Sequence, residues 1–354
     1  MKALIAIDSF KGCMTSAQAG KAALDAFRKG DAEVIPVSDG GEGFSTILTE
    51  RLGGTFRTVA CHDPLGRPIK AGYGIANNSR TAIIETAAAS GLGLLCKEEL
   101  NPLITTSYGT GELISDALEY GCEEIWLGLG GSATCDGGTG LLQALGCKSL
   151  ESCKITGFYD VSVPFCGPDG AARMFAPQKG ATPKMVEELD SRLSRLCEVY
   201  SALSGKDVLN IPGSGAAGGI GGALGGILGA TMVQGISKVL DISGLDRKLE
   251  FCDLVITGEG RADTQTLKGK VPVGVLEYVR AHSVKGNRPK VILVAGQVSE
   301  RQRLLEAGFD DVLQITPEGM PLSEALNPAT ASANITKAIL SYLQRSHAGA
   351  KDRI

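Results

Sequence analysis

The sequence predicts an α/β protein in which a doubly wound, Rossmann-like domain is built from both ends of the chain and a mixed α/β domain is inserted between them. Three observations carry this prediction. Near both ends, short apolar runs lead into glycine-rich turns and then into amphipathic segments, the order of strands and helices in such domains. In the middle, β-rich runs are separated by tight turns. The 48 glycines of the 354-residue chain gather at expected strand-to-helix junctions, where backbone must approach something closely.

The N-terminal part alternates between expected strands and helices. Residues 3–7 form an apolar run that ends at Asp8, and residues 33–37 form a second run that leads to Asp39. An amphipathic segment over residues 16–29 separates the two runs, and another helical pattern follows the second. Strands joined in this way are parallel, because each connection crosses over through a helix.

The pattern changes near residue 60. Residues 55–60, 69–75 and 81–85 are β-rich and are separated by turn residues, as in the run 63–66. Such turns join antiparallel strands. We therefore expect a domain boundary near residue 60.

Alternation of strands and helices returns from about residue 248. We expect residues 1–60 together with 248–354 to form the Rossmann-like domain, and residues 61–247 to form the inserted domain. The further elements expected along the chain are a helix over 109–120, strands over 124–129, 253–257, 291–295 and 311–315, and a last helix over 329–343.

Composition and charge exclude several classes of protein. Lys and Arg total 35 against 39 Asp and Glu, a net charge of −4, so we expect no nucleic-acid or membrane partner. The ten cysteines include no C-x-x-C pair and there are only three histidines, which argues against a zinc site. The N-terminus is too briefly apolar for a signal peptide, and the uncharged stretch 208–234 is too rich in glycine to span a membrane. We expect a reduced, cytoplasmic protein.

Polar clusters follow the expected strands at their carboxyl ends, where ligands of doubly wound sheets bind. The first cluster holds Asp8, Ser9 and Lys11, and it offers a carboxylate for Mg²⁺ and an ammonium group for phosphate or carboxylate. The second is Asp39-Gly40-Gly41-Glu42-Gly43, whose carboxylates could bind metal or accept a hydroxyl proton. Helix capping and a solvated lysine are the alternatives for these two clusters.

A third cluster, residues 128–140, has the highest information content in the chain. It follows an apolar run and combines glycines with hydroxyl residues and Asp136. This composition predicts an anion nest in which backbone N–H groups and hydroxyls surround phosphate oxygens. The cluster also contains G-x-G-x-x-A, a weak echo of the dinucleotide-binding pattern. Its candidate ligands are Gly130, Gly131, Ser132 and Thr134.

Three further clusters are less specific. Lys179, beside a glycine turn, suits a phosphate, although a lysine on a turn is usually solvated. Residues 213–218 match G-x-G-x-x-G without a convincing strand before them, so a phosphate loop or close helix packing explains them better than a dinucleotide site. The segment 258–270 suits a small polyanion plus metal, and a surface salt-bridge loop is its alternative. Its candidate ligands are Gly258, Glu259, Gly260, Arg261, Gln265 and Lys270.

Several common catalytic motifs are absent from the sequence. It contains no P-loop, no protein-kinase motif set and no G-x-S-x-G elbow, and its three histidines suggest no catalytic triad. If the chain handles phosphate, it does so with a less common fold.

Together, the clusters resemble the bacterial glycerate kinase family, the two-domain type that phosphorylates D-glycerate with ATP. The resemblance runs in order over essentially the whole chain. The chain departs from it in a segment around 148–163 that is shorter than usual, and at Cys135, where such sequences often have Asn. The blocks that carry the resemblance are DSFK (8–11), DGGEG (39–43), TAAASGL (86–92), YGTGELI (108–114), GGSAT with DGG (130–138), residues 175–183 and residues 258–266.

The resemblance implies ATP and Mg²⁺, glycerate as the substrate, and an active site in the cleft between the two domains. We expect Asp8, Asp39 and Glu259 to include the Mg²⁺ ligands. Asp39 or Asp136 is expected to accept the proton of the substrate hydroxyl. The cations expected to hold phosphate and the glycerate carboxylate are Lys11, Lys179, Arg261 and Lys270.

The residues alone leave the regiochemistry open. The resemblance favours 2-phosphoglycerate over 3-phosphoglycerate as the product, sugar-acid or glyoxylate catabolism as the setting, and a monomer or homodimer. Two other functions remain open at this point: an NAD(P)-linked dehydrogenase that uses residues 213–218, and a non-catalytic sensor of sugar acids.

Overall fold

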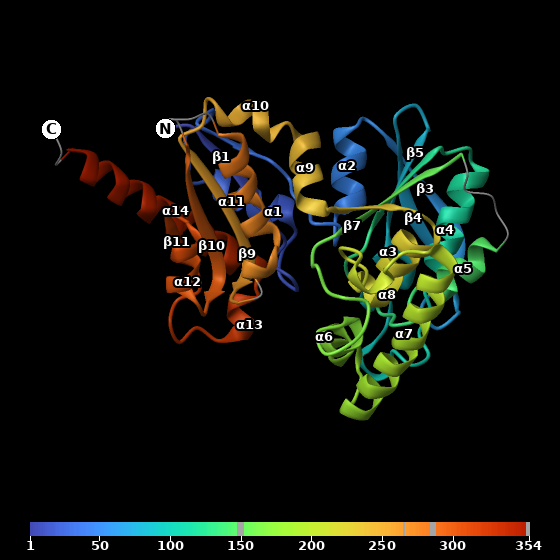
Figure 1. The fold of residues 1–354 in the computed structure, drawn as a ribbon. Helices are drawn as coiled ribbons and strands as arrows, with labels where there is room; N and C mark the ends of the chain where they lie inside the picture. The colour runs from blue at the N-terminus through green and yellow to red at the C-terminus, as the bar shows by residue number, and fades with distance from the viewer. Residues whose placement is uncertain (147–151, 265, 284–287, 352–354) are drawn as a thin grey trace. The chain divides into compact units, whose positions relative to one another are not determined.

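The computed structural model describes residues 1–146, 152–264, 266–283 and 288–351 (Figure 1). The chain folds into two compact units, Met1–Ser38 with Ile236–Ile354 and Asp39–Gly235. Both crossings between the units therefore come earlier in the sequence than the boundaries expected near residues 60 and 248.

Two helices account for the earlier crossings. Helix α2 (Phe44–Arg51) belongs to the second unit, because the Ser45 hydroxyl donates a hydrogen bond to Ile83 O at 2.7 Å. Helix α9 (Gly235–Ser243) buries Ile236 and Leu240 in the core of the first unit. A helical pattern reveals an apolar face but not which sheet covers that face. The boundaries expected from the sequence therefore assigned both helices to the wrong unit.

The first unit is a doubly wound parallel sheet, as the sequence predicts. Its strand order is β11-β10-β9-β1-β2. The chain steps from β1 to β2 on one side, whereas β9, β10 and β11 extend the sheet on the other. The winding therefore reverses between β1 and β9, which is where ligands of such sheets bind. The strands are β1 (Ala3–Ile7), β2 (Ala32–Val34), β9 (Leu254–Ala262), β10 (Lys290–Val298) and β11 (Asp311–Gln314).

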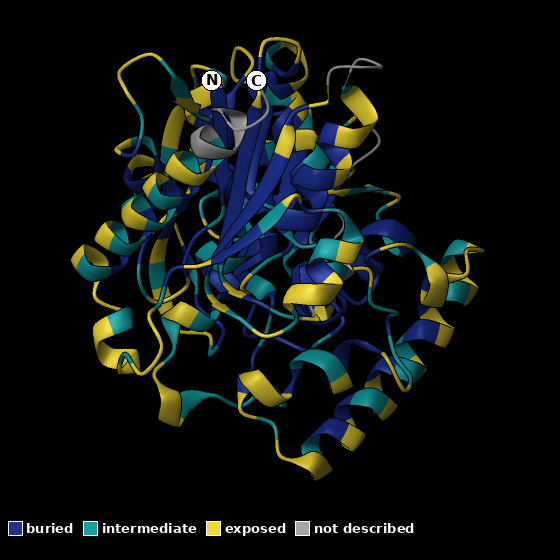
Figure 2. Cartoon of the chain, turned by 90° about the vertical axis from the view of Figure 1, so that its left-hand side faces the viewer, coloured by how far each residue is buried: buried dark blue, intermediate teal, exposed yellow. Residues whose placement is uncertain are grey.

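Helices cover both faces of this sheet. Successive residues of β1 enter opposite cores: Ile5 packs with residues of α1 and α14, and Leu4 packs with residues of α9 and α11. In Figure 2 the strands are buried, whereas many helices alternate between buried and exposed residues. The helices are α1 (Ser16–Leu24), α10 (Leu245–Leu249), α11 (Val271–His282), α12 (Arg301–Ala307), α13 (Leu322–Ala325) and α14 (Pro328–Lys351).

The second unit is a mixed α/β domain, again as predicted. Its sheet has the order β3-β4-β5-β6-β7-β8, antiparallel from β3 to β5 and parallel from β5 to β8. The turns of the sequence thus identify the antiparallel part correctly. The strands are β3 (Thr55–His62), β4 (Pro68–Ala76), β5 (Thr81–Glu85), β6 (Glu124–Gly128), β7 (Lys154–Tyr159) and β8 (Thr231–Gln234).

The other helices of this unit connect its strands and line its two cores. They are α3 (Thr86–Ser90), α4 (Tyr108–Glu119), α5 (Thr139–Leu145), α6 (Ala171–Phe175), α7 (Pro183–Ser204) and α8 (Ala216–Gly222). None of the helices in the part of the chain described above is long and apolar enough to cross a membrane.

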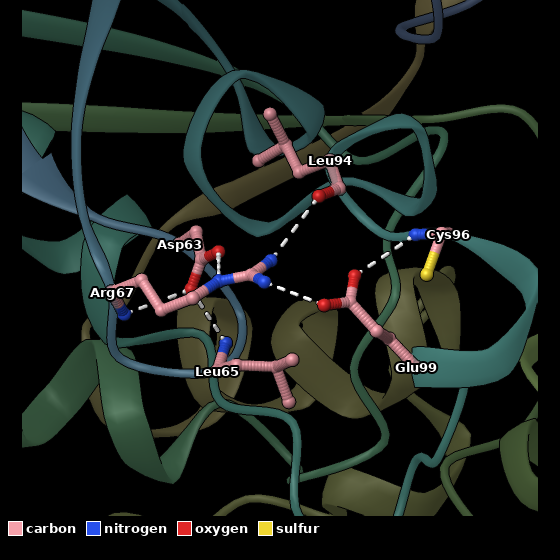
Figure 3. Close-up of polar contacts among 6 residues, drawn as sticks. All are labelled: Asp63, Leu65, Arg67, Leu94, Cys96 and Glu99. Carbon is pink, nitrogen blue, oxygen red and sulfur yellow. Dashed lines mark hydrogen bonds and ion pairs between the residues drawn. The ribbon is translucent and has the colours of Figure 1, made fainter.

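A buried carboxylate fixes the turn between β3 and β4 (Figure 3). Asp63 Oδ1 accepts hydrogen bonds from Leu65 N at 2.8 Å and Arg67 N at 2.9 Å, and Oδ2 accepts one from Arg67 Nε at 2.6 Å. The Arg67 guanidinium also reaches Glu99 Oε1 at 2.6 Å. The ion pairs therefore tie this hairpin to the segment that follows α3.

We expect Asp63→Asn to lower the free energy of unfolding by about 2 kcal/mol at neutral pH, because it removes a charged acceptor from three hydrogen bonds. Burial acts to raise the pKa of Asp63, but hydrogen bonds from Arg67 and Leu65 outweigh it, so the pKa lies below its ordinary value. The stabilisation is thus present above the unfolded pKa and is lost as pH falls through the folded pKa. Urea unfolding should separate the two proteins at pH 7 and bring them closer at about pH 3. An unchanged difference would contradict this role.

Candidate active site

The first unit brings one group of candidate residues to the point where its winding reverses. Asp8 directly follows β1, and its backbone N–H donates to Gly258 O in β9 at 2.9 Å. Asp8 Oδ1 accepts a hydrogen bond from Ser9 N at 2.7 Å. A Cβ atom on Gly260 would lie 3.5 Å from the Phe10 Cα atom. The turn after β1 and the end of β9 therefore form one polar edge.

Glu259 and Lys270 form an ion pair at this edge. Glu259 is buried, its Oε1 accepts a hydrogen bond from Thr266 Oγ1 at 2.6 Å, and its Oε2 lies 3.4 Å from Lys270 Nζ. Burial raises the pKa of Glu259, and the Lys270 ammonium opposes that shift. We expected Glu259 to bind Mg²⁺ and Lys270 to bind an anionic group of the substrates. Here their opposite charges neutralise each other instead.

Two of the remaining candidates of this unit, Lys11 and Arg261, are exposed, whereas Ser9 is buried. Lys11 lies on the turn after β1 and is exposed. Arg261 Nε lies 3.5 Å from Asp263 Oδ2, and its side chain is 66% exposed, so this weak pair leaves the guanidinium accessible to an anion. Gln265 lies outside the described residues.

The second unit joins two glycine loops at the carboxyl end of β6. Gly130 N donates a hydrogen bond to Gly40 O at 2.9 Å, and a Cβ atom on Gly130 would lie only 2.3 Å from Gly41 Cα. Asp39 is half-buried, and its Oδ1 accepts from Gly41 N at 3.1 Å. The glycines expected to bind phosphate therefore also allow two backbones to pack directly on each other.

Lys179 lies beneath the loop 130–134. Its side chain is 3% exposed, and Nζ donates to Ser132 Oγ at 2.9 Å and to Thr134 O at 2.7 Å. Burial lowers the pKa of Lys179 to about 8, so the amine is mostly charged at neutral pH. The alternative of a solvated lysine is therefore wrong.

The hydroxyl of Thr134 adds to the polarity of this loop. Thr134 Oγ1 is buried, and within the described chain no group pairs with it. A buried hydroxyl without a partner is costly. An anion bound on the loop is one way to satisfy it.

Asp136 is placed differently from the other acids. Its carboxylate accepts hydrogen bonds from Ser107 N and Ser107 Oγ, both at 2.8 Å, from Gly138 N at 3.1 Å and from Gly140 N at 3.2 Å. It thereby links the N-terminal ends of α4 and α5. These bonds occupy a carboxylate that the sequence proposed as a proton acceptor. The geometry therefore favours a helix-capping role for Asp136, which the sequence did not predict.

Sequence reasoning missed two groups. Ser107 is needed to hold Asp136, and the only signal for it is its place just before the expected helix 109–120. Glu85 is half-buried at the end of β5, where its Oε1 accepts from Ser45 N at 2.8 Å. Burial, with a smaller contribution from Glu42, raises the pKa of Glu85 to about 7. The only indication of Glu85 in the sequence is its position, as an acid at the end of the mainly apolar run 81–85.

The glycine cluster that begins at residue 213 has a packing role. A Cβ atom on Gly218 would lie 2.0 Å from Thr134 O, and one on Gly219 would lie 2.8 Å from Gly137 Cα. Helix α8 therefore packs directly on the loop after β6. Of the alternatives for residues 213–218, close packing is the one that the geometry favours.

Comparison with known proteins identifies the relatives of this chain. The sequence matches the Glycerate kinase family over residues 3–152 and 148–344. The two matched stretches overlap at residues 148–152, the start of the segment that is shorter here than is usual in the family. The chain is 38% identical to Glycerate kinase of Halalkalibacterium halodurans, with 91% of this chain and 93% of that protein covered.

Two further relatives agree. The chain is 39% identical to Glycerate 2-kinase of Escherichia coli strain K12, with 95% of this chain and 97% of that protein covered. A crystal structure that bears the name glycerate kinase 2, from Salmonella typhimurium LT2, is 37% identical, covers 99% of both chains and superposes with a TM-score of 0.78.

We expect Asp136→Asn to lower the free energy of unfolding by about 2 kcal/mol, because an amide nitrogen would face N–H groups that now donate to a carboxylate oxygen. Urea unfolding of the full chain measures the change. The control is Asp169→Asn, which alters an exposed carboxylate in the same unit. If Asp136→Asn left stability as unchanged as the control does, the capping role would be refuted.

Proposed function

Since this chain belongs to the glycerate kinase family, we propose that it transfers the γ-phosphoryl group of ATP to a hydroxyl group of D-glycerate. The observation that carries the proposal is the loop 130–134, held against residues 40–41 and resting on buried Lys179. Phosphoryl transfer depends on positioning and on neutralising phosphate charge more than on covalent chemistry. A glycine loop with an ammonium group beneath it is suited to both tasks.

Asp39 is the group that we assign as proton acceptor. Within the described chain, the Asp39 side chain accepts a hydrogen bond from Gly41 N, whereas the carboxylate of Asp136 already accepts four hydrogen bonds. In the proposed step the glycerate hydroxyl gives its proton to Asp39. The hydroxyl oxygen then bonds to the γ-phosphorus, and the bridging oxygen leaves with ADP.

The cations divide into two kinds. Lys11 and Arg261 are exposed, and we assign them to the anionic groups of glycerate and ATP. Lys270 is paired with Glu259, so its contact with a phosphate would compete with that ion pair. Lys179 acts from beneath the loop.

The residues fit Mg²⁺ as a partner of the nucleotide. Among the residues that the structure describes, no group of three or more His, Cys, Asp or Glu side chains could hold a metal by itself. Mg²⁺ on a nucleotide needs only one or two carboxylates beside the phosphates. Our candidate is Asp8, because Asp39 is assigned to the substrate proton and Glu259 already binds Thr266 and Lys270. When bound, the ion would neutralise phosphate charge.

We favour the 2-hydroxyl as the acceptor, with 2-phosphoglycerate as the product. The support is the name of the Escherichia coli relative, Glycerate 2-kinase. Such a product suits the breakdown of sugar acids or glyoxylate. The G-x-G-x-x-G match at residues 213–218 no longer supports the dehydrogenase alternative, because glycines of α8 pack on the loop after β6.

The product tests this proposal. We expect ³¹P NMR of the protein incubated with ATP, Mg²⁺ and D-glycerate to show a new phosphomonoester signal that grows when authentic 2-phosphoglycerate is added. Growth with 3-phosphoglycerate instead would overturn the regiochemistry. Intact ATP would overturn the kinase, and a thermal shift with D-glycerate alone would then favour the sensor.

A further inference from the structure

Glu85 lies at the carboxyl end of β5, beside the carboxyl end of β6 from which the loop 130–134 continues. Glu85 is the last residue of β5 and pairs in register with Gly128, the last residue of β6. The loop that leads to residues 130–134 begins directly after Gly128. Glu85 is therefore one strand away from the start of that loop.

Glu85 also contacts the other loop of the site. Its Oε1 accepts a hydrogen bond from Ser45 N, in the first turn of α2, at 2.8 Å. Helix α2 starts after Gly43, which has a left-handed φ of 83° and no side chain to cap the helix. The first N–H groups of a helix need acceptors. Glu85 supplies from a neighbouring strand the acceptor that α2 lacks.

Ser45 strengthens this connection. Its hydroxyl donates to Ile83 O at 2.7 Å and accepts from Gly74 N at 3.1 Å. The first turn of α2 is thus attached to β4 and β5 by both the backbone and the side chain of one residue. Because α2 directly follows residues 39–43, fixing this turn also fixes the loop that carries Asp39.

We propose that Glu85 is a positioning residue of the phosphoryl-transfer site: by accepting from the first turn of α2, it holds the loop 39–43 in register with the loop 130–134. This inference rests on the proposed function. The hydrogen bond from Gly130 N to Gly40 O shows that the two loops already pack on each other. Glu85 holds the far end of the same loop.

The acceptor that Glu85 supplies is kept at a cost to stability. A neutral serine or asparagine at the helix start would serve as a cap, whereas Glu85 is half-buried and faces the like charge of Glu42. Burial raises its pKa, so ionisation of Glu85 makes the folded state less stable as pH rises from the unfolded pKa toward the folded one. Residues kept at a cost to stability cluster at functional sites.

Two substitutions separate the acceptor from the charge. Glu85→Gln keeps an oxygen acceptor, and we expect its kcat to stay within about threefold of wild type. Glu85→Ala removes the acceptor, and we expect its kcat for glycerate phosphorylation to fall about 10- to 100-fold. The matched control is Glu50→Gln, an exposed carboxylate at the other end of α2, which should leave kcat unchanged. If Glu85→Ala does not fold, Glu85→Met fills similar volume without an acceptor.

Hydrogen exchange of residues 39–51 provides a readout that does not depend on the reaction. We expect faster exchange in Glu85→Ala and wild-type exchange in Glu85→Gln. Equal loss of kcat in both variants would overturn the proposal and assign the function to the charge. Wild-type kcat and exchange in Glu85→Ala would also overturn it. If wild-type protein makes no phosphoglycerate, the proposed function fails, and the exchange data still decide whether Glu85 holds this loop.

Discussion

The arrangement of the candidate site depends on the buried ammonium group of Lys179. It donates to Ser132 Oγ and Thr134 O, so it supports the loop and places a positive charge beneath it. A buried charge without an ionised partner is costly, and burial shifts the pKa of Lys179 down to about 8. A bound phosphate would compensate that cost, which links the stability of the loop to its proposed ligand.

Glycine serves two purposes around this loop. At Gly130 it lets the loop lie against Gly41, and at Gly218 it lets α8 lie against Thr134 O. The loop is therefore enclosed by backbone on both sides and supported by Lys179. The glycine surplus of the sequence indicated close approach correctly, but part of that approach is between segments of the chain itself.

Local patterns were sufficient to predict the fold class. Apolar runs identified β1, β9 and β10, and turn residues identified the antiparallel strands. The glycines expected in turns after two of these runs, Gly258, Gly260 and Gly296, instead lie within β9 and β10. The burial of Lys179 beneath the loop and the hydrogen bonds of Asp136 and Glu85 could not be predicted, because each depends on a contact with a residue far away in the sequence. The domain crossings were misplaced for the same reason, since a helix such as α2 does not reveal which sheet it covers.

The dependence of ATP affinity on pH tests the role of Lys179 most directly. With Mg²⁺ constant, calorimetric titration of the protein between pH 7 and pH 9.5 should show affinity falling about tenfold as the ammonium loses its proton around pH 8. Lys179→Arg keeps its charge over this range and should not show the decline. Wild-type affinity that stays constant up to pH 9.5 would contradict the account, because the loop would then bind ATP without the charge beneath it.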